Sequence, residues 1–284
     1  QLSLGVNGSQ TTKKGIEAQE QGISVTDAMV YYSPCQPVRN ADGSWSESTS
    51  TTQYYNPLSM INEDTNQTIY RRMQLTGKGE LNILPELTWT AQYSYLYNQN
   101  VLSEYHSTKS QIVKTHGQAR RSTYMDNKQV FETFGNFTHS FPGYHRLGLM
   151  VGYSWEQNNE NDGFGLTVKD FYNDAVKYYN LTYANQIDGI DAVESGAEST
   201  LRMISFYGRV NYSFASRYNF QATLRRDGSS AFGKNHRWAT FPSFSAAWRI
   251  GEEEWVRNLG IFSDLKLRVG YGVSGNSLGF NAYS

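Results

Sequence analysis

The chain has 284 residues, a formal net charge of −1 and a single cysteine, Cys35. The near-neutral charge provides no basic footprint for nucleic acid, and one cysteine excludes a disulfide framework or a cysteine-ligated zinc site within the chain. Aromatic residues make up 14% of the sequence, which is too many for a disordered chain, and no run approaches the ~18 apolar residues of a membrane-spanning helix.

Apolar residues alternate with polar or small residues along much of the chain, and this alternation predicts about nine β-strands. In the clearest segment the odd positions from Leu147 to Trp155 are apolar and the even positions are mostly small or polar. Several predicted strands match the ~9–11 residues that cross a bilayer. The predicted strands lie near residues 1–9, 69–83, 87–101, 128–141, 145–156, 201–214, 217–230, 238–250 and 264–275.

Short and long connections alternate between these strands. The short ones carry Pro, Gly or Ser and lie at 84–86, 142–144 and 215–217, whereas the long ones cover roughly 10–68, 102–127 and 157–200. Tight turns on one side and extended loops on the other are typical of bacterial outer-membrane barrels. We therefore predict an all-β fold, an antiparallel up-and-down transmembrane β-barrel with long extracellular loops.

Three segments near the C-terminus carry a specific resemblance. Residues 224–233, 238–250 and 265–276 resemble, in order and spacing, the strand and loop motifs of the SusC/RagA family of TonB-dependent outer-membrane transporters. Weaker echoes lie at 56–58 and 84–87. The family motif in the first segment is Arg225, Arg226, Asp227, Gly228, Ser229 and Ser230.

The resemblance implies a plugged, many-stranded barrel in the outer membrane of a Gram-negative, Bacteroidetes-type bacterium. It implies energy coupling through the TonB complex and a SusD-like surface lipoprotein that acts as a lid. The solutes would be oligosaccharides or peptides. Residues 1–284 would be part of one barrel domain, and we expect the plug, the TonB box and the C-terminal strands to lie outside this chain.

Two other classes of protein remain open on the pattern alone. One is a passive porin or structural outer-membrane barrel. The other is a soluble, secreted β-domain that binds glycans, which would have a complete chain of about this length and would need no detergent.

Charged residues at alternate strand positions are expected to face the lumen of the barrel. They would contact the plug or steer solute, and the alternative, a salt-bridged inner wall, is favoured over that role. The residues concerned are Arg146, Arg209, Arg225, Arg249, Lys266 and Arg268.

Aromatic residues in the long loops are candidates for contact with solute or lid, because rings stack on sugar and peptide faces. The alternative is that the loops pack on themselves. The candidates are Trp45, Tyr54, Tyr55, Tyr172, Tyr178 and Tyr179.

No catalytic, cofactor or metal site is predicted. Asp227-Gly228-Ser229-Ser230 reads as a turn, and the five histidines show no metal-ligand spacing. Residues 62–64 and 158–162 carry oxygen ligands for calcium but lack the spacing of a known calcium loop. The sequence therefore predicts a transporter segment and no enzyme.

Overall fold

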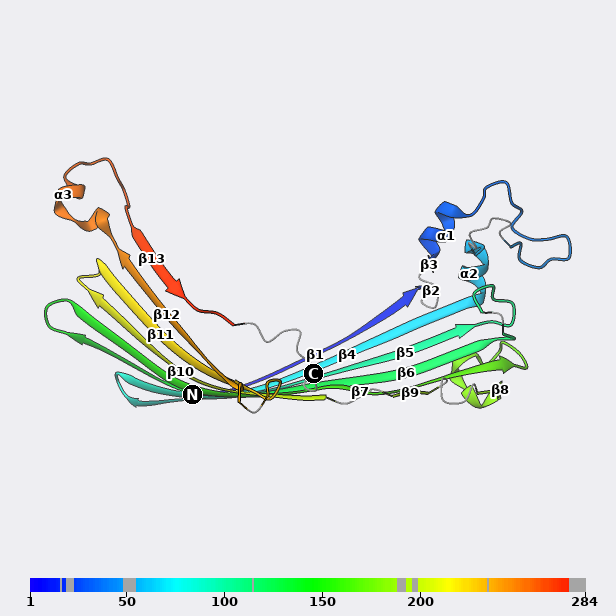
Figure 1. The fold of residues 1–284 in the computed structure, drawn as a ribbon, viewed down its shortest axis with the longest axis horizontal. Coiled ribbons are helices and arrows are strands. Elements are labelled where there is room, and N and C mark those ends of the chain that lie inside the picture. The colour runs from blue at the N-terminus through cyan, green and yellow to red at the C-terminus, as the bar shows by residue number, and fades with distance from the viewer. Residues whose placement is uncertain are drawn as a thin grey trace.

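The computed structural model describes residues 1–15, 17–18, 23–47, 55–113, 115–187, 193–195, 199–233 and 235–275. These residues form one strongly curved antiparallel sheet in which neighbouring long strands follow one another along the chain (Figure 1). The predicted all-β, up-and-down architecture is confirmed. Within the described residues the sheet is open, with β1 and β13 at its two edges.

Nine long strands make the wall of this sheet. They are β1 (Leu2–Gly15), β4 (Asp64–Leu84), β5 (Leu87–His106), β6 (Gln118–Phe141), β7 (His145–Phe171), β10 (Ser199–Phe214), β11 (Tyr218–Ser229), β12 (Trp238–Trp248) and β13 (Leu267–Gly272).

Shorter elements decorate the long connections. Two short strands, β8 (Ala184–Gln186) and β9 (Val193–Ser195), pair with β7, and β2 (Glu17–Ala18) pairs with β3 (Ile23–Ser24). The helices are α1 (Val25–Tyr31), α2 (Pro57–Glu63) and α3 (Glu254–Arg257), and 3-10 turns cover 177–179, 181–183 and 250–252. No helix among the described residues is long and apolar enough to span a membrane.

All nine predicted strands are present, but several extend further toward the long loops than the apolar alternation indicates. β6 begins at Gln118 instead of near 128, and β7 continues to Phe171, through much of a predicted loop. From Gln157 to Asp162 polar residues occupy both faces of β7, so the alternation that marks a strand is interrupted there before it resumes at Phe164, Leu166 and Val168. A bulge between Met125 and Asn127 shifts the register of β6 against β7 in this region.

The short turns have a backbone that few residues adopt. Gly143 and Tyr144 have φ angles of 86° and 70° between β6 and β7, and Ala215 and Ser216 have angles of 51° and 58° between β10 and β11. Left-handed residues allow two antiparallel strands to reverse within a few positions. These turns fix the pairing of the strands at one end of the sheet.

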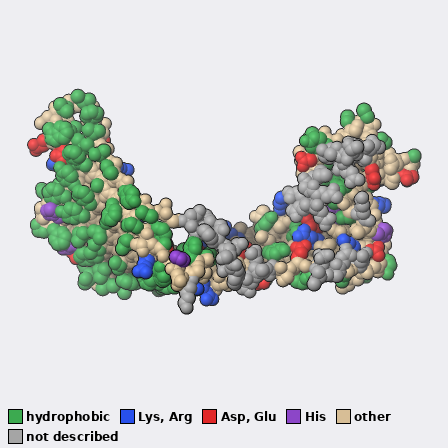
Figure 2. All heavy atoms as spheres, in the orientation of Figure 1, with side chains coloured by type: hydrophobic (Ala, Val, Ile, Leu, Met, Phe, Trp, Pro, Cys, Tyr) green, Lys and Arg blue, Asp and Glu red, His purple; other side chains and the backbone are tan. Residues whose placement is uncertain are grey.

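The strand register gathers the apolar alternate positions on one face of the sheet. Leu147 pairs with Tyr212, Tyr153 pairs with Phe206, and Phe220 pairs with both Tyr212 and Ala246. This outward face is open in the structure, with Val151 60% exposed. Hydrophobic side chains cover the β10–β13 arm in Figure 2, while charged side chains gather at the loop end. The opposite, polar face carries the even positions of β7 from Arg146 to Glu156.

Glycines on the wall accept aromatic rings from the neighbouring strand. The Tyr207 ring lies over Gly152, the Tyr124 ring lies over Gly163, and a Cβ at Gly135 would lie 2.8 Å from Trp89 Cε3. At these positions a ring covers the backbone that the glycine exposes, which gives part of the glycine and aromatic content of the sequence a shared function.

Buried hydrophobic clusters lie at the loop end. One joins Ala28 of α1, Met60 of α2 and Ile112 with Val113. The other is formed by Tyr105, Ala119, Val168, Phe171 and Tyr178, with the Tyr105 and Phe171 rings edge to face at 5.3 Å. The loops are therefore packed lobes and not open coils.

Candidate functional site

The polar face carries a side-chain network across four wall strands. The Tyr207 hydroxyl of β10 donates to Glu132 Oε1 of β6 at 2.7 Å. The Arg225 guanidinium of β11 lies 5.8 Å from the Tyr207 ring, donates to Ser205 Oγ at 2.9 Å and pairs with Asp227 at 2.8 Å. The network crosses β7 above Gly152, which has no side chain to block it.

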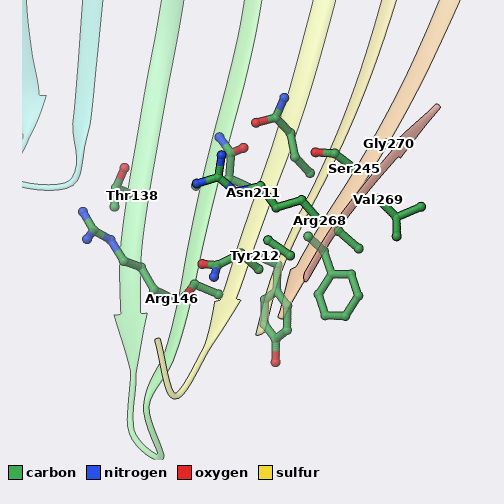
Figure 3. A pocket seen from close by; sticks show the side chains of 15 residues that line it. Thr138, Arg146, Asn211, Tyr212, Ser245, Arg268, Val269 and Gly270 are labelled. Atoms are coloured by element: carbon green, nitrogen blue, oxygen red, sulfur yellow. The ribbon is translucent and has the colours of Figure 1, made fainter. Parts of the chain in front are cut away.

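A groove of about 650 Å³ lies on the polar face near the tight turns (Figure 3). Arg268 reaches into it from β13, Arg146 borders it on β7 with its guanidinium turned toward Thr138, and Asn211, Gln221 and Ser245 line the strands between them. Guanidinium and amide groups offer many hydrogen-bond donors and carry no negative charge. The groove is therefore suited to acceptor-rich or anionic groups.

Four of the six predicted lumen-facing charges lie on the polar face: Arg146, Arg209, Arg225 and Arg268. The prediction placed Arg249 and Lys266 on the same wall, but both lie in the connection between β12 and β13, where Arg249 pairs with Glu252 at 3.2 Å. The apolar alternation continues past the ends of both strands, so parity alone does not show where strand pairing stops.

The predicted salt-bridged wall describes only part of the polar face. Lys78 pairs with Glu80 at 3.2 Å, and Lys128 pairs with Glu156 at 2.6 Å. Within the described residues, Arg146, Arg209 and Arg268 have no carboxylate partner. Two of these three, Arg146 and Arg268, line the groove near the turns, which therefore carries positive charge without a paired carboxylate.

A second, larger groove of about 1240 Å³ lies at the loop end between segments 36–47 and 108–116. Trp45 and Tyr55 line it, together with Arg39, Gln111 and His116. The Arg39 guanidinium lies 3.6 Å from the Trp45 ring centroid, and Trp45 Nε1 donates to Glu63 Oε1 at 2.8 Å. Ring, guanidinium and amide groups together can bind either sugars or peptide groups.

The candidate loop aromatics separate into buried and exposed positions. Trp45 is 8% exposed and Tyr178 is 6% exposed, and Tyr178 belongs to the cluster around Phe171 on the outward side of the wall. These two rings fit the alternative that the loops pack on themselves. Tyr172 and Tyr179 are each 74% exposed. Tyr55 is half-buried against the α1–α2 cluster, and Tyr54 lies outside the described residues.

The family motif closes the loop end of β11. Arg225 and Asp227 face the polar side, whereas Arg226 and Gly228 share the outward side with Leu224. Ser230 Oγ accepts from the Arg202 N–H at 2.8 Å, and the Ser230 N–H donates to the Arg202 carbonyl at 2.9 Å. Ser229 is the last residue of β11, and Ser230 joins the end of this strand to β10.

Three acidic residues organise the connections through contacts that the sequence does not predict. Asp174 accepts from the Tyr105 hydroxyl, the Thr108 N–H and the Thr108 hydroxyl, each at 2.8 Å. Burial raises the pKa of Asp174, but these hydrogen bonds outweigh it and hold the pKa below its usual value. No spacing signal joins residues 66 positions apart, so only the fold reveals the contact.

Glu194 and Glu253 bridge elements in a similar way. Arg120 Nε lies 2.6 Å from Glu194 Oε1, across Gly165. The hydrogen bonds that Arg120 donates lower the pKa of Glu194. Glu253 accepts from the Tyr218 hydroxyl at 2.6 Å and from Trp248 Nε1 at 3.0 Å, and these bonds lower the pKa of Glu253. Glu253, which immediately precedes α3, therefore holds the β12–β13 connection against the wall.

Metal ligands do not gather in the described part of the chain: no three His, Cys, Asp or Glu side chains form a group that could hold an ion. In the first proposed calcium stretch, Glu63 accepts from Trp45 and from the Ser107 hydroxyl at 2.6 Å, and Asp64 pairs with His106 at 2.9 Å. These carboxylates are already engaged by protein groups.

Comparison with known proteins gives consistent matches. Residues 20–284 match the family described as TonB dependent receptor-like, beta-barrel. The chain is 26% identical over 283 residues to TonB-dependent receptor P3 of Formosa agariphila, covering 97% of this chain and 28% of that protein. It is 49% identical over 73 residues to TonB-dependent receptor SusC of Bacteroides thetaiotaomicron, covering 26% of this chain and 7% of that protein.

Solved structures agree on the fold. The RagAB peptide transporter structure aligns with 97% of this chain and 31% of its own chain, at a TM-score of 0.77 and 20% sequence identity. The chain spans less than a third of the length of the curated relatives that it matches.

Proposed function

This chain belongs to the TonB-dependent receptor-like β-barrel family, and on that premise we propose that it is part of the wall of an outer-membrane importer. The importer would take up oligosaccharides or peptides with TonB-coupled energy. Strands outside the chain would pair with β1 and β13 and close the barrel, because unpaired edges are costly in lipid. The proposal gives the chain no catalytic step.

The observation that carries this proposal is the division of the wall into an apolar outward face and a polar inner face. On β7 the outward residues run from His145 to Trp155, ten residues apart. At ~3.3 Å per residue this is about 33 Å of strand, or about 25 Å of height at a tilt of ~40°. That height matches the apolar band of an outer-membrane barrel.

The two grooves mark the proposed solute path. The loop-end groove at Trp45 and Tyr55 would receive solute beneath a SusD-like lipoprotein lid. The groove at Arg146 and Arg268 would meet solute or the plug further inside, where uncompensated guanidinium groups face the lumen. The exposed rings of Tyr172 and Tyr179 would contact the lid or the solute from the rim.

Uptake by the full-length protein tests this function. We expect import of oligosaccharide or peptide into cells to stop when TonB is deleted or the proton gradient is collapsed, while surface expression persists. A passive porin would continue to conduct under both conditions, and this result would refute energy-coupled import.

Loop variants test the aromatic assignments separately. We expect Tyr172→Ala with Tyr179→Ala to weaken lid binding or lower uptake without changing the melting temperature, because both rings are exposed. The matched control is Tyr178→Ala, which should destabilise the lobe around Phe171. Unchanged uptake and unchanged lid binding in the double variant would exclude the exposed rings from the path.

A further inference from the structure

We propose that a strip of arginines on the outward face binds the phosphorylated headgroups of membrane lipids. The outward arginine strip consists of Arg71 on β4, Arg202 on β10 and Arg226 on β11. Each lies two residues to the loop side of an outward apolar residue of its strand, Met73, Ile204 and Leu224 respectively, and on β4 one more apolar residue, Ile69, lies beyond Arg71. The strip therefore lies at the loop side of the apolar band, within one outward position of its border on β4.

The strip is held in place by neutral groups. Arg71 donates from Nε to Gln10 Oε1 and from Nη1 to Gln99 Oε1, both at 3.0 Å. Arg202 Nε donates to Gln157 Oε1 at 3.0 Å. These amides orient the guanidinium groups but do not neutralise them.

Arg226 is oriented by a ring instead of an amide. Its guanidinium lies 5.4 Å from the ring of Trp238, which faces outward on the neighbouring strand. Within the described residues, none of the three arginines of the strip has a carboxylate partner. Each keeps a positive charge and spare N–H donors available to a ligand.

The charge of the outward face beyond the apolar band has one dominant sign. Among the described wall strands, the alternate positions there carry two acids, Asp162 and Asp170 at the end of β7, against five basic residues: Lys14, Arg71, Arg121, Arg202 and Arg226. The polar face behind them mixes both signs, as at Lys128 with Glu156 and Arg120 with Glu194. Exposure to water alone does not account for an excess of basic residues on one face only.

Phosphorylated lipid headgroups fit the strip in both position and chemistry. Headgroups lie at the border where the apolar band ends, and a planar guanidinium can bind phosphate oxygens through two parallel hydrogen bonds. Lipid chains would at the same time cover the outward apolar residues directly beside the strip. This inference rests on the proposal that the outward face meets lipid.

The test uses the full-length protein in nanodiscs of phosphatidylcholine doped with lipid A or with dephosphorylated lipid A. The variant replaces Arg71, Arg202 and Arg226 with Gln. The matched control replaces Arg146, Arg209 and Arg268 with Gln, which removes the same charge from the opposite face. Native mass spectrometry then measures how much doped lipid each protein retains, with and without added inorganic phosphate.

We expect the wild type and the control to retain phosphorylated lipid A in preference to the dephosphorylated form. The outward variant should lose about fivefold in this preference for each arginine, on the order of a hundredfold in total. Loss of retention in the control as well, or equal retention of both lipids by the wild type, would overturn the inference. Failure of all proteins to enter nanodiscs would instead count against the proposed membrane function.

Discussion

Apolar side chains are treated differently in two halves of the sheet. They are exposed in the wall half, near the tight turns, and buried in the loop-side half. In the wall half, Val151, Phe220 and Val269 are exposed on the outward face. In the loop-side half, Met60 and Phe171 are fully buried between loop segments and strands. The two sets therefore lie in different environments. Lipid would cover the first set, while the second set must form a core of its own in water.

The largest effect should come from the loop-side core. Phe171→Ala removes a fully buried ring, and the loss of packing should cost about 3–5 kcal/mol of local stability. Hydrogen exchange should show faster exchange across residues 172–186 while the wall stays protected. The exposed neighbour Tyr179→Ala is the control, and equal exchange in both variants would show that the lobe has no core of its own.

A charged residue placed in the apolar band tests the wall half of this comparison. Val151→Arg places a cation on the outward face and should cost about 2–4 kcal/mol in a bilayer, although Val151 makes few contacts within the chain. Urea unfolding of the full-length protein in vesicles measures this cost. The control is Met150→Arg on the polar face. A cost below ~0.5 kcal/mol for Val151→Arg would mean that water, not lipid, covers the outward face.

The glycine–ring contacts of the wall predict an intermediate effect. A Cβ at Gly152 would overlap the Tyr207 ring, so Gly152→Ala should cost about 1–3 kcal/mol. At Gly208 the nearest atom to an added Cβ is the Met150 carbonyl oxygen at 3.7 Å, so Gly208→Ala should cost less than ~1 kcal/mol. Denaturant midpoints compare the two, and equal midpoints would remove the ring contact as a source of stability.

The smallest effect should come from the turn carboxylate Glu253. Its pKa is lowered in the folded protein, so its stabilising contribution is present above the ordinary Glu pKa of about 4.3 and is lost as the pH falls through the lowered value. Melting temperatures between about pH 6 and pH 3 should therefore fall more steeply in the wild type than in Glu253→Gln. Parallel curves would contradict a charged Glu253 in the folded state.

The same contrast explains what the sequence could predict. Where one face is apolar, as from Leu147 to Trp155, alternation located the strand and its outward residues. Where both faces are polar, as from Gln157 to Asp162 on β7, the alternation is interrupted, and the sequence predicts a loop from there although the strand continues to Phe171. The helices α1 and α2 lay inside another predicted loop, since each is only seven residues long.

The candidate site was predictable in its polarity but not in its contacts. The positions of Arg146, Arg209, Arg225 and Arg268 on one face follow from parity alone. Which of them form ion pairs depends on the register between strands, and the sequence of a single strand does not determine that register. The burial of Trp45 and Tyr178 likewise depends on contacts with Glu63 and Phe171 from other segments.

The left-handed turns at Gly143–Tyr144 and Ala215–Ser216 have a consequence for how such proteins diversify. Because pairing is fixed from the turn end, residues can be inserted into or deleted from the opposite connections without moving any strand by one position. Natural selection can then exchange whole rim segments while the scaffold is inherited unchanged. Recognition and folding are thereby free to evolve at different rates within one gene.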